Sequence, residues 1–302
     1  MTNLVLWGLV ALMAGGCDRG STGAGKPSTN PAGPRVTVAS LVPAATDLLV
    51  AMGAADHLVA VSNFESDPRV KGLPRVGDYL NTDWETLATA KPAVMLVQMK
   101  MVPPGLEANA RRFKIRLVNL SIDRLPDVLT ANKALGEVIG RPDLAAALDA
   151  KLRARLDAIK RRVARKAPVA ALVVVSDSGR SLAGRENFLD DVLRLAGGTN
   201  AAGGLGSLWP KVDEETLAGM KPAVIIQLLP GASPQVLEKA RAAWAATPGI
   251  PAVRDGRVHV ITDDWALLPG SHVADLAERF EAALHPDDSS ATRPATTMGS
   301  AR

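Results

Sequence analysis

Short apolar runs alternate with longer amphipathic stretches from residue 36 to about residue 284. Short runs rich in Val, Ile and Leu are typical of buried strands, whereas apolar residues that recur every three or four positions indicate helices. Over the first half, the pattern predicts a strand at 36–41, a helix from Pro43, an apolar run at 58–61, a helix at 82–90, a strand at 94–97, a helix at 104–113 and a strand at 115–120. Such alternation is typical of a mostly parallel sheet covered by helices.

The alternation starts again in the second half of the chain. It predicts a strand at 169–175, helices at 187–196 and 213–220, a strand at 223–228, a helix at 234–246, a strand at 258–261 and a last helix at 271–284. The expected fold class is therefore α/β. We expect two similar lobes, each with a mostly parallel sheet and flanking helices.

A long helical stretch separates the two alternations. Helical spacing continues from Pro126 to Lys166, and Gly140-Arg141-Pro142 interrupts it, because proline cannot continue a helix. Beyond the interruption, apolar residues form the stripe of an amphipathic helix: Leu144, Leu148, Leu152, Leu156, Ile159 and Val163. We expect this long helix to join the two lobes.

A sequence repeat supports two related lobes. Residues 79–94 return in altered form as residues 209–224, with nine identical positions at a constant offset of 130. Both copies contain Glu-Thr-Leu-Ala and then Lys-Pro-Ala-Val, and an aromatic residue (Tyr79 or Trp209) lies six positions before the shared glutamate. The offset is too long for a solenoid repeat. Two similar lobes that face each other across a cleft are the expected arrangement.

The amino-terminal segment is predicted to direct export. Residues 4–16 form an uncharged apolar run that is shorter than the roughly 20 residues needed to span a bilayer, and they fit the h-region of a signal peptide. Cys17 is the only cysteine, and it follows Ala-Gly-Gly, which resembles a bacterial lipoprotein cleavage site. An uncleaved anchor and a buried structural cysteine are the alternatives.

These patterns predict the organisation of the chain. The expected parts are a lipoprotein-type signal peptide at 1–17 with Cys17 as the lipidation site, a flexible tether at 18–34, an N-terminal lobe at 35–122, an interlobe helical segment at 123–167, a C-terminal lobe at 168–285 and a disordered polar tail at 286–302. We expect a monomer on the periplasmic or cell-surface side of a membrane, attached to it through lipid.

The net charge of +4 is modest, and much of the basic excess comes from one segment. Residues 151–166 contain eight basic residues and one acid, Asp157. On an amphipathic helix, these residues form mostly the solvated face. Nucleic-acid binding is not expected, because the segment carries no interleaved aromatics and the chain has no reader motif.

Aromatic residues concentrate in polar loops. Of the nine beyond residue 17, five lie in or beside segments rich in Gly, Pro, Asp and Asn: Phe64, Tyr79, Trp84, Trp209 and Trp265. In open parallel sheets, ligands bind at the carboxyl ends of the strands, where such loops gather. A single ring can fill the space beneath its own loop. Five rings together favour a flat apolar surface for a ligand.

Glu85 and Glu215, the repeated glutamates, have two interpretations. Thr82 and Glu85 have the spacing of a capping box, with Thr82 as the N-cap. Val212 stands in the equivalent place of the second copy, so capping explains Glu215 less well. A pair of exposed carboxylates, one on each lobe, also suits docking onto a two-fold partner that offers basic sockets.

Two motifs resemble a known family. Val38–Leu49 (VASLVPAATDLL), and Glu85 followed by Lys91-Pro92-Ala93-Val94, are similar to motifs of ABC-importer substrate-binding proteins for cobalamin, ferric siderophores and haem. The resemblance covers roughly residues 35–285. It implies two lobes joined by a rigid helix, and a binding protein that is not an enzyme and carries no cofactor. It also implies that Glu85 and Glu215 dock to arginines of a dimeric permease in the membrane.

Several segments are most similar to the cobalamin-binding members. They are Val61–Phe64 with Asp67-Pro68, Tyr79 where those members have a tryptophan, Trp209–Val212 and Thr262–Trp265. The resemblance implies that cobalamin or a related corrinoid binds between the lobes. The residues expected to bind it are Phe64, Tyr79, Gln98, Trp209, Asp264 and Trp265.

Other large chelates remain alternatives. An anionic ferric siderophore favours a cluster of bases, for which the candidates are the scattered Lys100, Arg180, Arg185 and Lys211. Haem requires an axial ligand, for which Tyr79 and His272 are candidates. A receptor that signals instead of importing also remains open.

Two other classes of protein fit less well. Ser271, His272 and Asp264 supply the residue types of a hydrolase triad, but no Gly-x-Ser-x-Gly elbow precedes a helix, and we expect Ser271 to cap the last helix. A metal-ion receptor needs converging ligands, whereas the histidines are dispersed: His57, His259, His272 and His285. We therefore expect neither a catalytic residue nor a metal site.

Overall fold

The computed structural model describes residues 35–78 and 80–286. The predicted signal peptide, Cys17, the tether, Tyr79 and the predicted tail beyond Pro286 lie outside the described residues. No helix among the described residues is long and apolar enough to cross a membrane.

Two four-stranded parallel sheets have the same strand order. The first consists of β1 (Val38–Ser40), β2 (Leu58–Val61), β3 (Val94–Val97) and β4 (Arg116–Asn119), in the order β2-β1-β3-β4. The second consists of β5 (Val169–Val174), β6 (Gly198–Asn200), β7 (Val224–Leu228) and β8 (Val258–Ile261), in the order β6-β5-β7-β8. The prediction of two similar α/β lobes is confirmed.

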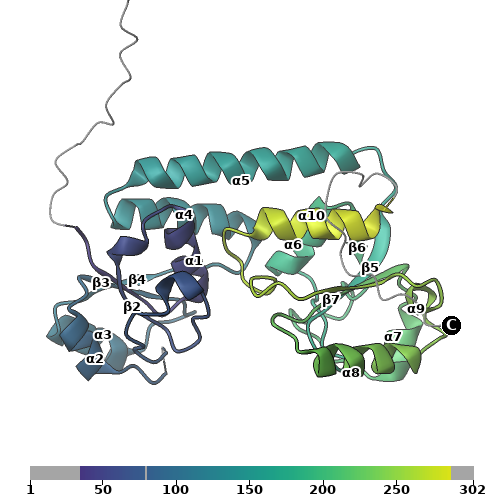
Figure 1. Ribbon diagram of the computed structural model, residues 1–302, viewed down its shortest axis with the longest axis horizontal. Coiled ribbons are helices and arrows are strands. Elements are labelled where there is room, and N and C mark those ends of the chain that lie inside the picture. Colours follow the sequence, from purple (N-terminus) through teal and green to yellow (C-terminus); the bar gives the residue numbers. More distant parts are fainter. Residues whose placement is uncertain (1–34, 79, 287–302) are drawn as a thin grey trace, which may run out of the picture. The chain divides into compact units, whose positions relative to one another are not determined.

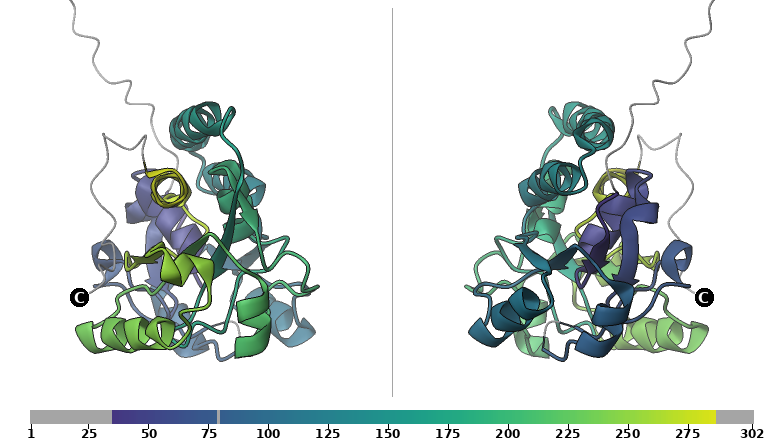
Figure 2. Two further views of the ribbon diagram at one scale, coloured as in Figure 1. Left: turned by 90° about the vertical axis from the view of Figure 1, so that its right-hand side faces the viewer. Right: turned by 90° about the vertical axis from the view of Figure 1, so that its left-hand side faces the viewer.

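The helices pack on these sheets and join them (Figure 1). They are α1 (Pro43–Ala51), α2 (Trp84–Ala90), α3 (Pro104–Arg112), α4 (Leu125–Val138), α5 (Pro142–Val163), α6 (Phe188–Leu195), α7 (Glu214–Gly219), α8 (Pro234–Ala245), α9 (Pro251–Arg254) and α10 (Val273–Leu284), with short 3-10 turns η1 (Ala55–His57) and η2 (Pro68–Val70). The end-on views show α5 outermost, beyond α4 and α10 (Figure 2). The helical stretch therefore ends and restarts at the predicted interruption, between α4 and α5.

Strand residues alternate between a shared core and a core private to each lobe, as the two-residue period of a strand requires. In β3, Val94 and Leu96 belong to the largest hydrophobic cluster, and Met95 and Val97 belong to a cluster of the first lobe. In the second lobe, β7 alternates in the same way: Val224, Ile226 and Leu228 belong to the shared cluster. The shared cluster also contains residues of α1, α4, α5, α6 and α10. One continuous core therefore connects the lobes through the helical layer.

The sequence repeat corresponds to a structural repeat. Asp83 caps α2 and Asp213 caps α7, each by accepting a backbone N–H from the first turn. Each helix is followed by a lysine with positive φ, 49° at Lys91 and 47° at Lys221, a conformation that commonly ends helices although glycine usually supplies it. The predicted capping box is wrong: Asp83, not Thr82, is the N-cap, and the Thr82 hydroxyl donates to the Asp78 carbonyl oxygen.

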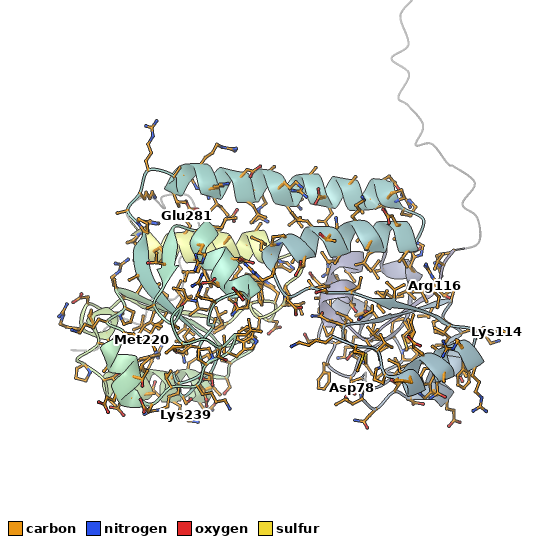
Figure 3. All side chains as sticks on the ribbon, turned by 180° about the vertical axis from the view of Figure 1, so that it is seen from behind. Asp78, Lys114, Arg116, Met220, Lys239 and Glu281 are labelled. Carbon is orange, nitrogen blue, oxygen red and sulfur yellow. The ribbon has the colours of Figure 1, made fainter. Side chains whose placement is uncertain are left out.

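The predicted amphipathic stripe of α5 is buried except for Leu144, which is partly buried, and most of the opposite face is exposed as expected. Two of its basic residues instead hold α10. The Arg155 guanidinium donates to the carboxylates of Asp275 and Glu278 at 2.7–3.2 Å, and Arg162 donates to Glu281 on α10. Glu281 is labelled in Figure 3. The basic excess of this segment therefore partly serves helix pairing.

Candidate ligand-binding site

The exposed large hydrophobic side chains of the described residues all lie in loops that follow strands. Phe64 and Leu80 follow β2, Met101 follows β3, Leu267 follows β8, and Leu205, Leu208 and Trp209 follow β6. Leu205, Leu208, Trp209 and Leu267 also line hollows among these loops. In parallel sheets, the carboxyl ends of the strands are also where ligands bind.

Three adjoining hollows lie on the second lobe among these loops. One of about 340 Å³ is lined by Ile122, Asp123, Val175, Glu186, Asn187, Phe188, Leu208, Trp209, Leu267 and Pro269. A second of about 460 Å³ shares Val175 and Leu267 with it and continues along Leu228–Ser233. A third of about 430 Å³ shares Trp209 and continues to Lys211, Asp213 and Thr216. The first hollow, here called the central hollow, includes Ile122 and Asp123, which follow β4 of the first lobe.

Trp209 projects from a loop that is tied to the loop after β5. The Gly184 N–H donates to the Leu208 carbonyl oxygen at 2.9 Å, and the Leu182 N–H donates to the Pro210 carbonyl oxygen at 2.9 Å. The side chains of Leu208 and Trp209 stay about half exposed, at 46% and 47%. The predicted binding residue Trp209 lines two of the hollows.

Phe64 projects from the loop after β2 and is 71% exposed. The Arg75 guanidinium holds this loop by donating to the carbonyl oxygens of Ser62 (2.9 Å) and Glu65 (2.6 Å). Asn63, next to Phe64, exchanges bonds with the Gly77 backbone: its N–H donates to the Gly77 carbonyl oxygen, and its Oδ1 accepts from the Gly77 N–H. The loop is braced, and its ring points into solvent.

Gln98 reaches the central hollow through Asp123. Its Nε2 donates to Asp123 Oδ1 at 3.2 Å, and Asp123 also accepts a bond from the Ser121 hydroxyl. Asp264 is exposed, and its Oδ1 lies close to Gly231 in the second hollow, 3.0 Å from where a Cβ would stand. The amide and the carboxylate predicted to bind ligand thus lie beside hollows without lining them.

Two of the loop rings pack inward. Trp84 begins α2 and stacks on Phe113, with ring centroids 5.6 Å apart, beside the private core of the first lobe. Trp265 is half buried and stacks on the His272 imidazole at 5.0 Å. Each of these two rings fills the space beneath its own loop. Leu267, two residues beyond Trp265, lines the central hollow instead.

A buried carboxylate connects α1 with the residues before α10. Asp47 is 5% exposed and accepts bonds from both the N–H and the hydroxyl of Ser271. A Cβ on Gly270 would stand 2.2 Å from Asp47 Oδ2, so the close approach requires glycine. The prediction that Ser271 caps α10 is therefore wrong. The Ser271 hydroxyl donates to Asp47, and the residue before α10 is His272, which makes no side-chain cap.

His272 lies between two carboxylates. Its Nδ1 is 3.0 Å from Asp275 and its Nε2 is 3.8 Å from Asp47 Oδ1, and the Arg69 guanidinium lies 3.9 Å from the same oxygen. The hydrogen bond with Asp275 and the charge of Asp47 raise the pKa of His272 above its usual 6.5, against the effects of burial and of Arg69. Both ring nitrogens face carboxylates, which leaves neither directed at a haem iron or at the Ser271 hydroxyl.

We expect this histidine to make stability depend on pH. Because the folded-state pKa of His272 is raised, its contribution is fully present below the unfolded value of 6.5 and is lost as pH rises through the folded pKa. Replacing His272 with glutamine should therefore lower the free energy of unfolding at about pH 5.5 and have a smaller effect at about pH 8.5. Urea unfolding of both proteins at the two pH values measures this. An equal loss at both values would contradict it.

Glu85 and Glu215 are both exposed and occupy the second position of their helices. Helices α2 and α7 lie on the side of the molecule away from α5 in every view (Figures 1 and 2). Asp78 and Lys239 mark that side on the two lobes in Figure 3. The structure thus has one exposed repeated glutamate per lobe, each on a helix that lies on this side.

The charged residues that line the hollows are mainly acids. They are Asp123, Asp177, Glu186 and Asp213, with Lys211 as the one base among them. Asp177 is paired with Lys239 at 2.7 Å, and Asp213 caps α7. Glu186 is exposed in the central hollow, and its φ of 66° is unusual for a residue with a side chain. In residues 35–78 and 80–286, no group of His, Cys, Asp and Glu is arranged to hold a metal ion.

Sequence reasoning missed several residues of the site. Leu208 and Leu267 could have been found by the signal that identified the rings, because both are large apolar residues in segments rich in Gly, Ser, Asp or Pro. Glu186 and Asn187 carry no such signal, since their places depend on the left-handed backbone at Glu186 and on bonds made after folding.

Comparisons with known proteins agree with this architecture. A family model described as periplasmic binding protein matches residues 38–265. The vitamin B12-binding protein of Vibrio campbellii is 23% identical over 255 residues, covering 82% of this chain and 90% of that protein. Two solved structures are similar: the periplasmic vitamin B12-binding protein of Vibrio cholerae (TM-score 0.71, 23% identity, 85% of this chain and 99% of that chain) and a periplasmic haem-binding protein of Pseudomonas aeruginosa (TM-score 0.73, 25% identity, 87% and 97%).

Proposed function

Since this chain belongs to the periplasmic binding protein family of ABC importers, we propose that it captures cobalamin or a related corrinoid between its lobes and delivers it to a membrane permease. The observation that carries the proposal is the placement of exposed apolar side chains in loops that follow strands of both lobes. Phe64 and Met101 on the first lobe and Leu208, Trp209 and Leu267 on the second offer apolar area that no core uses. A broad, flat ligand is the class that such a surface suits.

The charges beside this surface favour a corrinoid over anionic chelates. A corrin carries amide groups around its rim, and amide N–H groups are donors that the carboxylates of Asp123 and Glu186 can accept. The carboxylates of haem and the net negative charge of many ferric siderophores would meet these acids with Lys211 as the one base in the hollow linings. Of the two candidate axial ligands for haem, His272 is committed to Asp275 and Asp47, and Tyr79 lies outside the described residues.

Vitamin B12-binding relatives also support the proposal. Proteins of that name from several Vibrio species match this chain over about four fifths of its length. The haem-binding neighbours have the same fold with similar TM-scores, so fold alone does not separate the ligands. The order of affinities therefore has to be measured.

The test is a fluorescence titration of the chain beginning at Cys17 with cyanocobalamin, haemin and a ferric hydroxamate. We expect cyanocobalamin to quench tryptophan emission with a saturating curve at the lowest concentration, because Trp209 is half exposed at the site. If cyanocobalamin gave a flat curve while haemin or the hydroxamate gave a saturating one, the corrinoid assignment would be wrong and that other compound would be the ligand class.

The proposal extends to the location and the partner. Residues 4–16 and Cys17 have the pattern of a lipoprotein signal peptide, and we propose attachment to the membrane through lipid on Cys17 at the periplasmic or cell-surface side. If Cys17→Ser stays with the membrane fraction as the wild type does, lipid on this cysteine is not the anchor. Glu85 and Glu215 are proposed to dock to the permease, with the chain acting as a monomer.

A further inference from the structure

Asn187 uses both ends of its side-chain amide. It is 3% exposed and precedes α6, where its Oδ1 accepts a bond from the Asp190 N–H at 3.1 Å and so caps the helix. Its Nδ2 donates to the Leu208 carbonyl oxygen at 2.9 Å and lies 3.2 Å from the Gly184 carbonyl oxygen. One side chain thus connects the start of α6 with the residue before Trp209.

The bond to Leu208 is part of a tight contact between two loops. The Leu208 carbonyl oxygen also accepts the Gly184 N–H at 2.9 Å. A Cβ on Gly184 would stand 1.9 Å from the Ser207 carbonyl oxygen, so the two backbones touch directly. The Trp209 loop therefore lies on Gly184 with no room for a side chain between them.

A second side-chain amide, that of Asn200, also holds the loop that contains Gly184. Asn200, at the end of β6, places its Nδ2 3.0 Å from each of the Ala183 oxygen, the Gly184 oxygen and Asp190 Oδ1. Its Oδ1 accepts the Ala202 N–H. The loop from β6 to Trp209 is therefore held at its start by Asn200 and near its tip by Asn187.

Helix capping alone does not require asparagine at 187. Serine and aspartate cap helices about as well, because a cap needs only an acceptor. The donor Nδ2 is what asparagine adds, and in this structure that donor is directed at the loop carrying Trp209. Serine at this position would remove one of the two donors to the Leu208 carbonyl oxygen and leave only the Gly184 N–H. A loop loosened in this way must be ordered again when ligand binds.

We propose that Asn187 is a positioning residue for ligand binding: its amide donor fixes the Leu208 carbonyl so that Leu208 and Trp209 stand preorganised at the rim of the central hollow. This rests on the proposed function, since it makes Trp209 a contact for the ligand. Asn187 also lines that hollow.

The test compares Asn187→Ser with Asn132→Ser. Asn132 is a fully buried amide on α4 that donates to the Ala145 carbonyl oxygen at 2.7 Å, far from the Trp209 loop in sequence and fold, so it controls for the loss of a buried amide. We expect Asn187→Ser to weaken cyanocobalamin binding about tenfold, with Asn132→Ser binding as the wild type does. Equal affinity for wild type and Asn187→Ser, or equal weakening in both variants, would overturn the proposal.

A second measurement does not depend on the ligand. With 5-fluorotryptophan in the full chain, the fluorine resonance of Trp209, assigned by Trp209→Phe, should shift and change width in Asn187→Ser and stay unchanged in Asn132→Ser. If wild type does not bind cyanocobalamin, the corrinoid assignment fails while this readout still decides whether Asn187 holds the ring. If the serine variant does not fold, Asn187→Asp takes its place, because aspartate keeps the shape of the side chain and the helix cap. An unchanged Trp209 resonance in the variant that folds would overturn the proposal.

Discussion

Replacing both Glu85 and Glu215 with alanine is expected to abolish import of cyanocobalamin by cells and leave the affinity for cyanocobalamin unchanged. Each glutamate is exposed at the second position of its helix, one on each lobe. The two helices, α2 and α7, both lie away from α5 (Figure 1). Losing one partner of a charge pair at an interface costs about 2–5 kcal/mol, so losing two should lower import at least about a hundredfold. Uptake of labelled cyanocobalamin by cells that carry each variant measures this.

The matched control is Glu107→Ala with Glu238→Ala. Like Glu85 and Glu215, these two glutamates lie on helices of different lobes, Glu107 on α3 and Glu238 on α8. Each forms an ion pair with an arginine on its own helix. We expect import to stay near the wild-type level in the control. Normal import by the Glu85 and Glu215 double variant, with the protein present at wild-type amount, would refute the docking assignment.

Trp209→Ala is expected to give the largest loss of affinity among single changes. A tryptophan at the centre of a binding surface contributes at least about 2 kcal/mol when truncated, which corresponds to roughly 30-fold weaker binding. The folded state should be little affected, because the Trp209 side chain is 47% exposed and its loop is held through backbone atoms of Leu208 and Pro210. Calorimetric titration with cyanocobalamin measures the loss.

Trp84→Ala is the control of equal size. Trp84 packs on Phe113 and the private core of the first lobe, so its loss should reduce thermal stability and leave the affinity for cyanocobalamin unchanged. If Trp209→Ala bound cyanocobalamin as tightly as the wild type, Trp209 would not be part of the binding site. A similar loss in both variants would indicate general destabilisation instead.

The fold could be predicted because its signals are local and occur twice. Runs of apolar residues predicted the strands that are buried in the cores. The repeat at 79–94 and 209–224 predicted that the two segments are equivalent, and in the structure Asp83 matches Asp213 and Lys91 matches Lys221. The strand β6 was not predicted, because Gly198-Thr199-Asn200 is short and has no apolar run. It is a strand because it pairs with β5, which no local pattern reports.

Two capping predictions failed because a competing partner was present. Asp83 follows Thr82 directly and its carboxylate accepts the N–H groups of Glu85 and Thr86, so the N-cap lies one residue later than predicted and the helix begins at Trp84. Ser271 bonds to Asp47, more than two hundred residues away in sequence. Contacts of that range arise from the packing of the lobes and cannot be read from local spacing.

The site was predictable by residue type and less so by orientation. Phe64 and Trp209 are exposed at strand ends, as large rings in polar loops indicated. Trp84 and Trp265 have the same sequence context, yet they stack on Phe113 and His272. The direction of a ring depends on which neighbour lies beneath its loop, and that neighbour comes from another part of the chain. The role of Asn187 depends on a carbonyl 21 positions away in sequence.

The most direct measurement is a crystal structure of the chain grown with cyanocobalamin. We expect one corrin ring in contact with Trp209, Leu208 and Leu267 on the second lobe and with Phe64 on the first. The amides on the rim of the ring should lie near Asp123 or Glu186. A corrin bound elsewhere, with these side chains still facing solvent, would contradict the claim that the two sets of loops form a single binding site.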